Sequence, residues 1–238
     1  MLKISRSILV VSMIALSAHA GEKSLFNGKE LGGWKGQDGF WSVRDGAIIG
    51  QSTAEHPVKE NTFLILEGME VADFELRLRY KITDGNGKTL EFGNSGVQYR
   101  SKLVKPEYSV VAGYQADIEC GKTYSGIVYE EKGRGILANC GEKVIVKDGA
   151  DSKKPVIEVV GEVGKLEDIQ ASIKPADWNE YVIIAKGNRI QHFINGKATA
   201  ELIDESSTGA KKGILALQLH AGGPMTVQFK DIILKTGD

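Results

Sequence analysis

Hydrophobic and polar residues alternate strictly in several short stretches of this chain, and the most informative stretch runs from Gly113 to Glu119. Successive side chains of an extended strand point to opposite faces. One face of this strand therefore holds Gln115, Asp117 and Glu119, and the other holds residues that suit a core. A solvated surface often carries such polar groups. However, neighbouring like charges repel, so acids without a basic partner in the strand favour a cleft or a metal site.

Alternation of the same kind predicts strands at residues 74–81, 94–100 and 213–220. Turn signals lie between the apolar runs. At Asp45-Gly46, for example, a tight hairpin turn needs the positive φ that glycine adopts without strain. The chain is therefore expected to consist largely of short strands joined by turns.

Helical spacing of apolar residues is found from Leu166 to Ile173 and predicts one short helix before Pro175. The polar stretch 141–155 indicates a mobile loop. Many strands, one small helix and no regular succession of strand and helix predict an all-β sandwich.

The first twenty residues have the pattern of a secretory signal peptide. A positive start at Lys3 and Arg6 precedes an apolar run at residues 8–16, and small residues precede Gly21. We therefore expect residues 1–20 to be removed and residues 21–238 to form a single exported domain, periplasmic or secreted. The apolar run is too short for an ordinary membrane span, and no later segment is longer.

The charge balance does not point to nucleic acid. Without Lys3 and Arg6, 28 of the 30 basic side chains remain against 31 acidic ones, a formal charge of −3 with neutral histidines. A nucleic-acid-binding protein is expected to carry a basic surface instead.

The two cysteines, Cys120 and Cys140, flank a predicted hairpin. In an oxidising compartment this arrangement favours one disulfide between them. Two free thiols or part of a metal site are the alternatives, although no Cys-x-x-Cys motif or nearby histidine supports zinc.

Three of the predicted strands carry a polar face near one end, and we hypothesise that these faces meet on one concave sheet surface. Amides and carboxylates hydrogen-bond sugar hydroxyls, and an aromatic neighbour such as Tyr129 can pack on a sugar ring. The residue types therefore suit a carbohydrate ligand. The polar side chains are Gln98 and Arg100 in the first strand, Gln115, Asp117 and Glu119 in the second, and Gln218 and His220 in the third.

Seven short motifs follow one another between Ser24 and Lys235, and together they resemble the 3-keto-disaccharide hydrolase family. The resemblance implies a concanavalin-like jelly-roll sandwich of two antiparallel sheets with one short helix. It also implies secretion by environmental bacteria and action on glycosides already oxidised at C3. The motifs are residues 25–31, Trp34, residues 94–100, 113–115, 177–181, 194–196 and 216–220.

A ketone at C3 acidifies the C2 proton, so a base that removes it and an acid that assists the C1 leaving group can cleave the glycosidic bond by elimination. His220 is the candidate base or acid, since imidazole titrates near neutrality. Asp117 and Glu131 complete the expected catalytic set. Arg100, or a divalent cation such as Ca²⁺ held by Asp117 and Glu119, is expected to polarise the ketone oxygen. The residues expected to bind substrate are Gln98, Arg100, Gln115, Glu119, Tyr129, Arg134 and Gln218.

The chain departs from the family at one point. Many members have a glutamate at the position of Gln115 and a glutamine at that of Asp117, so the acid has moved by two positions. Laminarinase-type jelly rolls carry Glu-x-Asp-x-Glu on one strand, but an amide at Gln115 cannot form their covalent glycosyl intermediate. A non-catalytic, lectin-like carbohydrate-binding domain with a structural Ca²⁺ is the alternative to an enzyme, because the same polar face would suffice for it.

Overall fold

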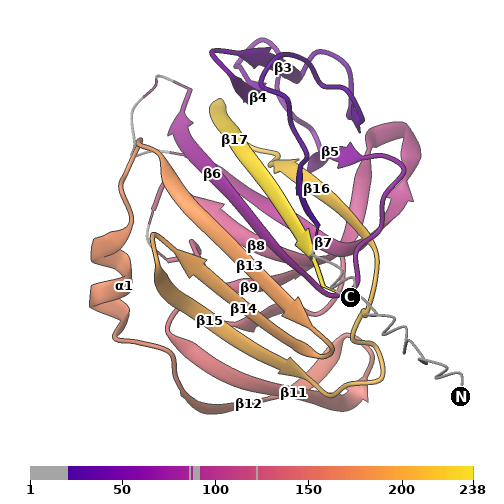
Figure 1. The fold of residues 1–238 in the computed structure, drawn as a ribbon, viewed down its shortest axis with the longest axis vertical. Coiled ribbons are helices and arrows are strands. Elements are labelled where there is room, and N and C mark those ends of the chain that lie inside the picture. Colours follow the sequence, from indigo (N-terminus) through magenta and orange to yellow (C-terminus); the bar gives the residue numbers. More distant parts are fainter. Residues whose placement is uncertain (1–20, 86, 88–91, 122, 238) are drawn as a thin grey trace, which may run out of the picture.

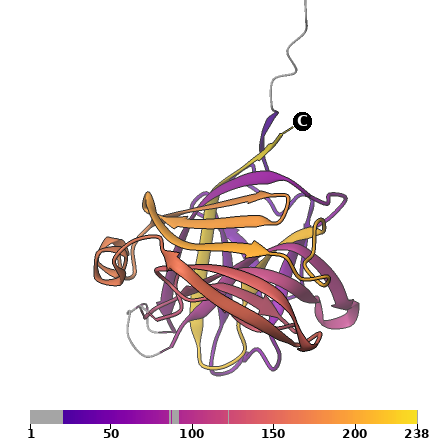
Figure 2. The same ribbon diagram turned by 90° about the horizontal axis from the view of Figure 1, so that it is seen from below.

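The computed structural model describes residues 21–85, 87, 92–121 and 123–237. The predicted signal peptide, residues 1–20, lies outside the described residues. The described residues form a pair of β-sheets that lie face to face (Figure 1, Figure 2). The predicted jelly-roll sandwich is confirmed, with one α-helix, α1 (Leu166–Ser172), in the predicted place among the described residues.

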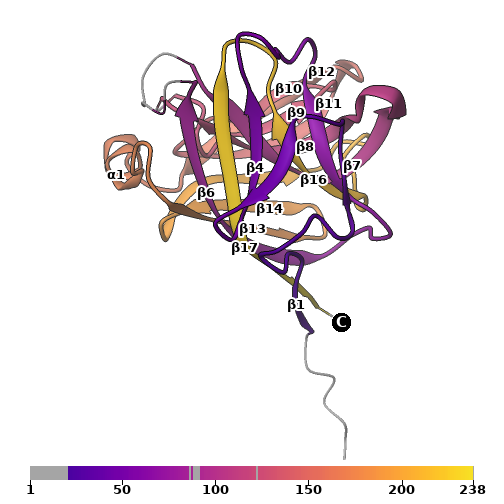
Figure 3. The ribbon, with the colours of Figure 1, turned by 90° about the horizontal axis from the view of Figure 1, so that it is seen from above.

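The larger sheet has ten strands, and its last partner is the short β1 beside the end of β17, near the C-terminus (Figure 3). In spatial order its strands are β12 (Lys154–Glu162), β11 (Glu142–Asp151), β15 (Lys197–Asp204), β14 (Arg189–Ile194), β13 (Asn179–Lys186), β6 (Phe74–Asp84), β17 (Met225–Thr236), β4 (Ala47–Ser52) and β3 (Trp41–Arg44), with β1 (Glu22–Ser24) paired to β17.

The smaller sheet has seven strands and carries most of the polar residues singled out above. Its spatial order is β10 (Gly135–Ala138), β9 (Val128–Glu131), β8 (Val110–Glu119), β7 (Asn94–Lys105), β16 (Ile214–Leu219), β5 (Thr62–Leu66) and β2 (Trp34–Lys35), and a 3-10 turn (Pro106–Tyr108) joins β7 to β8.

Two sequence-based expectations need correction. Residues 141–155 are not a loop: they form β11 and the start of β12, a hairpin at the edge of the larger sheet. Nor are the sheets wholly antiparallel, because β11 pairs with β15 in parallel, while the other pairings of the described strands are antiparallel. The buried side chains of Val144 and Val146 hold β11 in this position.

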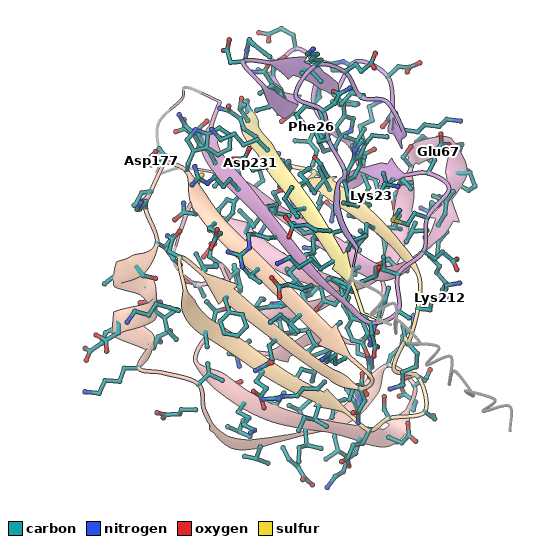
Figure 4. The ribbon with its side chains drawn as sticks, viewed as in Figure 1. Lys23, Phe26, Glu67, Asp177, Lys212 and Asp231 are labelled. Atoms are coloured by element: carbon teal, nitrogen blue, oxygen red, sulfur yellow. The ribbon has the colours of Figure 1, made fainter. Side chains whose placement is uncertain are left out.

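Alternation places the core between the sheets. In β8 the side chains of Tyr114, Ala116 and Ile118 are buried in the main hydrophobic cluster. The odd-numbered neighbours Gln115 and Asp117 consequently point to the opposite side, which we call the outer face of the seven-stranded sheet. On the ten-stranded sheet the side facing solvent carries charged pairs such as Arg79–Asp231, 3.8 Å apart. Figure 4 labels Asp231 on this side.

The β7–β8 hairpin bends out of its sheet. The register of β7 and β8 shifts after Tyr99, where Arg100 has a φ of 47° and Gly113 opposite has a φ of 143°. Past this bulge, Val110 and Val111 pack on Phe63 of β5 in a small separate apolar cluster. The hairpin therefore covers part of the outer face.

None of the helices in the described portion of the chain is long and apolar enough to cross a membrane.

Candidate functional site

A cleft of about 310 Å³ opens on the outer face of the seven-stranded sheet. Six of the ten residues selected from the sequence line it, and they come from three strands and from the residue after β16. Polar side chains that were not foreseen, Asn61 and Asn94 among them, complete the wall. The full lining is Asn61, Asn94, Gln115, Asp117, Tyr124, Ile127, Tyr129, Glu131, Ile136, Gln218 and His220.

Asp117 is the central acid of this cleft. Its side chain is buried, and the amide nitrogen of Gln115 donates a hydrogen bond to its Oδ1. Burial raises the pKa of Asp117 to about 8; the bond from Gln115 opposes this rise, and the nearby charges of Glu119 and Glu131 add to it. At neutral pH Asp117 is therefore mostly protonated and can donate a proton.

Gln115 is held in place by a row of amides and by the absence of a side chain at Gly96. Its amide is hydrogen-bonded to that of Gln98 at 2.6 Å, and its Nε2 also donates to Oε1 of Gln218 at 3.3 Å. Gly96 lies beneath: a Cβ there would stand 2.5 Å from the side chain of Gln115. Gln98 itself is completely buried, bonds Ser101 at 2.7 Å, and does not line the cleft.

Gln218 lines the cleft and has an amide nitrogen without a hydrogen-bond partner among the described residues. Its side chain is fully buried. Because an unsatisfied buried donor is costly, such a group is expected to be retained where a ligand acceptor takes the bond.

His220 directly follows β16, and its Nε2 has no hydrogen-bond partner among the described residues. Its Nδ1 is hydrogen-bonded to the carbonyl oxygen of Ala221, which can only accept, so Nδ1 carries the proton. Burial lowers the pKa of His220, and the Ala221 carbonyl partly opposes that. The neutral ring is therefore favoured, and its Nε2 is left as a proton acceptor.

Glu131 forms the opposite side of the cleft, at the end of β9. The residue is 5% exposed, and the Asn61 amide lies 3.4 Å from Oε2 and 3.5 Å from Oε1. Burial raises the pKa of Glu131, while Lys132 and the hydrogen bond from Asn61 lower it. Tyr129, two residues earlier on the same face, has a raised pKa through burial and the charge of Glu131.

The expected placement of Arg100 on the polar face is wrong, because its side chain lies away from the cleft. The positive φ at Arg100 breaks the alternation on which that expectation rested. The side chain is 1% exposed, donates to the carbonyl oxygens of Ala72 (2.8 Å) and Gly187 (2.7 Å), and pairs with Asp73 at 3.1 Å. Arg100 ties loops together and does not reach the cleft.

Two further residues expected to bind substrate also lie outside the cleft lining. Glu119 turns back, and its Oε1 accepts a hydrogen bond from the backbone N–H of Tyr124 at 2.6 Å. Arg134 is buried between the sheets, where it pairs with Glu130 at 2.6 Å and Asp204 at 2.8 Å.

The predicted disulfide is wrong, because Cys120 and Cys140 are both free thiols. Cys120 packs against the main core, whereas Cys140 belongs to a separate cluster with Ile127 and Ile169. Burial raises the pKa of each thiol to about 11, so both remain protonated at neutral pH.

No group of three or more His, Cys, Asp or Glu side chains among the described residues has a geometry that could hold a metal ion. A cation held by Asp117 and Glu119 stays a prediction, and the hydrogen bond that the Glu119 carboxylate accepts from Tyr124 does not favour it.

Two of the polar residues missed by sequence reasoning, Asn61 and Tyr124, lie outside the alternating strands. Asn61 precedes β5 and Tyr124 lies in the loop before β9, so neither belongs to a stretch of alternating hydrophobic and polar residues that could have indicated it. Asn94 belongs to the same alternating face as Gln98 and was within reach of the same argument.

Solved structures share this fold at low sequence identity. A candidate glycosyl hydrolase from Parabacteroides distasonis superposes with a TM-score of 0.57 at 21% identity, covering 92% of this chain and 94% of its own. The carbohydrate-binding module CBM66 from Bacillus subtilis superposes with a TM-score of 0.53 at 15% identity, covering 86% and 96%. A Bacillus subtilis protein with a galectin-like fold gives 0.52 at 13% identity, covering 86% and 90%.

None of the curated protein sequences is significantly similar to this chain. The profile of the 3-keto-alpha-glucoside-1,2-lyase-like domain, by contrast, matches residues 21–235, nearly the whole described range. The family resemblance noted in the sequence motifs is thereby confirmed. The chain belongs to the family of 3-keto-alpha-glucoside-1,2-lyase-like domains.

Proposed function

We propose that this protein cleaves 3-keto-glycosides by removing the C2 proton and expelling the C1 substituent. Membership of the 3-keto-alpha-glucoside-1,2-lyase-like family supports this substrate class. The observation that carries the proposal is that one cleft holds both a protonated acid and an unprotonated base. Asp117 keeps its proton, with a pKa of about 8, while burial keeps His220 neutral. An elimination needs this pair, an acid and a base that are both ready at neutral pH.

In the first half of the reaction, Nε2 of His220 takes the proton from C2, and the electron pair moves to the C3 oxygen as an enolate. The unpartnered Nε2–H of Gln218 donates to that oxygen and replaces Arg100 as the polarising group. The electron pair then returns to form the C1=C2 double bond, the C1–oxygen bond breaks, and Asp117 gives its proton to the leaving oxygen.

In the second half, water adds to C1 of the unsaturated ketone. Asp117, now ionised, takes a proton from the water. Protonated His220 exchanges its Nε2 proton with solvent and then gives a proton to C2. Glu131 accepts a hydrogen bond from the same water and holds it near C1. The products are a 3-keto-sugar and the free alcohol, and both residues recover their starting protonation states.

The test is cleavage of a 3-keto-glycoside and of its unoxidised parent, run in D₂O with release of the aglycone followed by NMR. We expect cleavage of the ketone substrate alone, with deuterium at C2 of the product. Cleavage without deuterium at C2 would point to direct displacement at C1 and overturn the elimination. Sugar binding without any cleavage would leave the lectin-like alternative, for which the fold of the CBM66 neighbour is a precedent.

The His220→Ala variant is expected to lose about 10²- to 10⁴-fold in kcat, the usual contribution of a general base. His56→Gln is the matched control, because His56 is an exposed histidine stacked on Phe40 and absent from the cleft lining. The same assay with and without EDTA and added Ca²⁺ tests whether a divalent cation contributes.

The sequence pattern of residues 1–20 supports export as an element of the same proposal. Fractionation of expressing cells and N-terminal sequencing of the purified protein check it. A periplasmic or secreted chain that begins at Gly21 is the expected result, and an uncleaved chain retained in the cytoplasm would contradict it.

A further inference from the structure

One residue outside the alternating strands links the two sides of the cleft. Asn61, directly before β5, lines the cleft and donates from Nδ2 toward the carboxylate of Glu131, 3.4 Å from Oε2. Its Oδ1 accepts a hydrogen bond of 2.9 Å from the backbone N–H of Ala221, the residue next to His220. A single amide thus contacts the carboxyl on one side and the main chain beside the imidazole on the other.

The residue before it makes a parallel connection. The carboxylate of Glu60 pairs with Lys132 at 3.1 Å and with Lys105 at 2.9 Å. Two consecutive residues therefore contact two others: Asn61 contacts Glu131, and Glu60 contacts Lys132. We call these four residues the clasp. The ion pairs are exposed and weak one by one, but together with the buried Glu131 they fix a short segment at two points.

The strand order shows that this contact does not follow from sheet pairing. Three strands, β8, β7 and β16, lie between β5 and β9. At about 4.8 Å per step, four strand spacings correspond to roughly 19 Å across a flat sheet. The clasp consequently reaches across the outer face, where Asn61 connects the end of β9 with the residues that follow β16.

We propose that Asn61 is a positioning residue that holds Glu131 and the backbone beside His220 in the arrangement needed for catalysis, and that Glu60 anchors it through Lys132. The inference rests on the proposed function for its catalytic consequence, but the contact itself can be tested without turnover. Asn61 supplies the only neutral donor that the described residues direct at Glu131. Loss of that donor leaves the buried carboxylate with Lys132 as its remaining support.

Removing the amide should therefore raise the pKa of Glu131, and placing a carboxylate at position 61 should raise it further by like-charge repulsion. Other groups share this environment and remain in each variant. The charged and titratable groups around Glu131 are Asp117, Tyr124, Tyr129 and His220 in the cleft, Glu60 and Lys132 in the clasp, and Arg100, Lys102, Glu130, Lys153 and Lys212 in the adjoining groove.

The experiment compares Asn61→Ala and Asn61→Asp with the wild type in two readouts. The first is the titration of the Glu131 carboxyl, followed by ¹³C NMR and assigned with Glu131→Gln. The second is the pH profile of kcat on a 3-keto-glycoside. We expect the Glu131 midpoint to move upward in the order wild type, Asn61→Ala, Asn61→Asp. We also expect kcat at neutral pH to fall about 10- to 100-fold, with a smaller change in KM, as is usual for loss of a group that orients another.

Asn139→Asp is the matched control, because Asn139 makes the same kind of bond, 3.1 Å from Nδ2 to the carboxylate of Glu142, away from the cleft. It should change neither readout. An unchanged Glu131 midpoint in both Asn61 variants overturns the proposal. If the wild type proves inactive on every 3-keto-glycoside, the proposed function fails, and the NMR titration still decides whether Asn61 controls Glu131.

Asn61→Ser covers the case in which the alanine and aspartate variants fold poorly. Its hydroxyl is too short to bridge the N–H of Ala221 and the carboxylate of Glu131 at once, so the link is broken while a polar group stays at position 61. The upward shift of the Glu131 midpoint is expected here too, and Glu60→Gln should produce a smaller, salt-sensitive loss of kcat because it breaks only the anchoring ion pairs. A folded Asn61→Ser variant with the wild-type midpoint contradicts the inference.

Discussion

Two buried polar clusters of this protein contain similar residue types but differ in how completely their hydrogen bonds are satisfied. Between the sheets, Arg134 donates to Glu130, Asp204 and the hydroxyl of Ser206, the last at 2.8 Å. On the outer face, Gln218 keeps a donor without a partner among the described residues, and Asp117 keeps its proton. A closed set of partners stabilises a connection between layers, whereas an incomplete one leaves groups available to a ligand.

The difference is visible in the electrostatics as well. Burial opposes the charge on Arg134, but hydrogen bonds and attraction from Glu130 and Asp204 outweigh it, so the pKa of Arg134 lies above its ordinary value. In the cleft no cation among the described residues balances Asp117, and burial dominates. The same loss of solvent thus yields a stable ion pair in one place and a neutral acid in the other.

The largest expected effect follows from breaking the closed cluster. Arg134→Met removes the cation and leaves the carboxylates of Glu130 and Asp204 buried without it. We expect the free energy of unfolding to fall by about 3–5 kcal/mol, as measured by urea denaturation. A loss below about 1 kcal/mol would show that the cluster is not the structural tie described here.

The next prediction concerns the pH dependence of stability through Asp117. Its pKa is about 8 in the folded protein against an ordinary value of 3.8 for the unfolded chain, so between these values the folded state binds more protons. Stability should therefore fall as pH rises from 3.8 to about 8. Asp117→Asn cannot ionise and should lose this slope, with little activity left. The melting temperatures of the wild type and Asp117→Asn at about pH 5 and about pH 9 test this prediction. An equal change in melting temperature between these pH values for both proteins would contradict it.

Gly96→Ala probes how tightly the amide row of the cleft is packed. The added Cβ would overlap the side chain of Gln115, so we expect a stability loss of about 1–3 kcal/mol and a drop in kcat. Gly161→Ala is the control, since a Cβ there meets no atom within 4 Å. Thermal melting and turnover of both variants give the comparison, and equal behaviour of the two would remove Gly96 from the support of the site.

The smallest expected effect is that of a reductant. With Cys120 and Cys140 free, thiol titration of the unfolded protein should find two thiols, and dithiothreitol should leave the melting temperature unchanged. A disulfide lost on reduction would instead cost about 2–5 kcal/mol. A clear fall in melting temperature would therefore restore the pairing that the sequence suggested.

Local alternation predicted much of the fold and the centre of the cleft. The period of two places Gln115, Asp117 and Gln218 on one side of their strands without any knowledge of the partners, because it depends only on backbone geometry. It failed where the backbone departs from that geometry. A positive φ at Arg100 reverses the side chain, and no residue pattern in β7 marks it.

Long-range features could not be predicted from the same patterns. Asn61 reaches the cleft because the segment before β5 crosses the outer face, which depends on the order of the strands. The spacing of Cys120 and Cys140 along the chain likewise says nothing about the distance between their side chains. The edge strand β12 is exposed along its length, so it lacks the buried positions that would have revealed it.

The bent hairpin between β7 and β8 stands on the outer face against β5, and if the proposed function holds, it limits which end of a carbohydrate can enter. Its 3-10 turn is tied to β5 by bonds from the N–H of Phe63 to Ser109 (3.0 Å) and from the hydroxyl of Thr62 to Tyr108 (3.0 Å). A groove left open at both ends would let a polymer thread through and be cut internally. With this wall across the outer face, we expect the terminal unit of a short chain to be admitted and long polysaccharides to be refused.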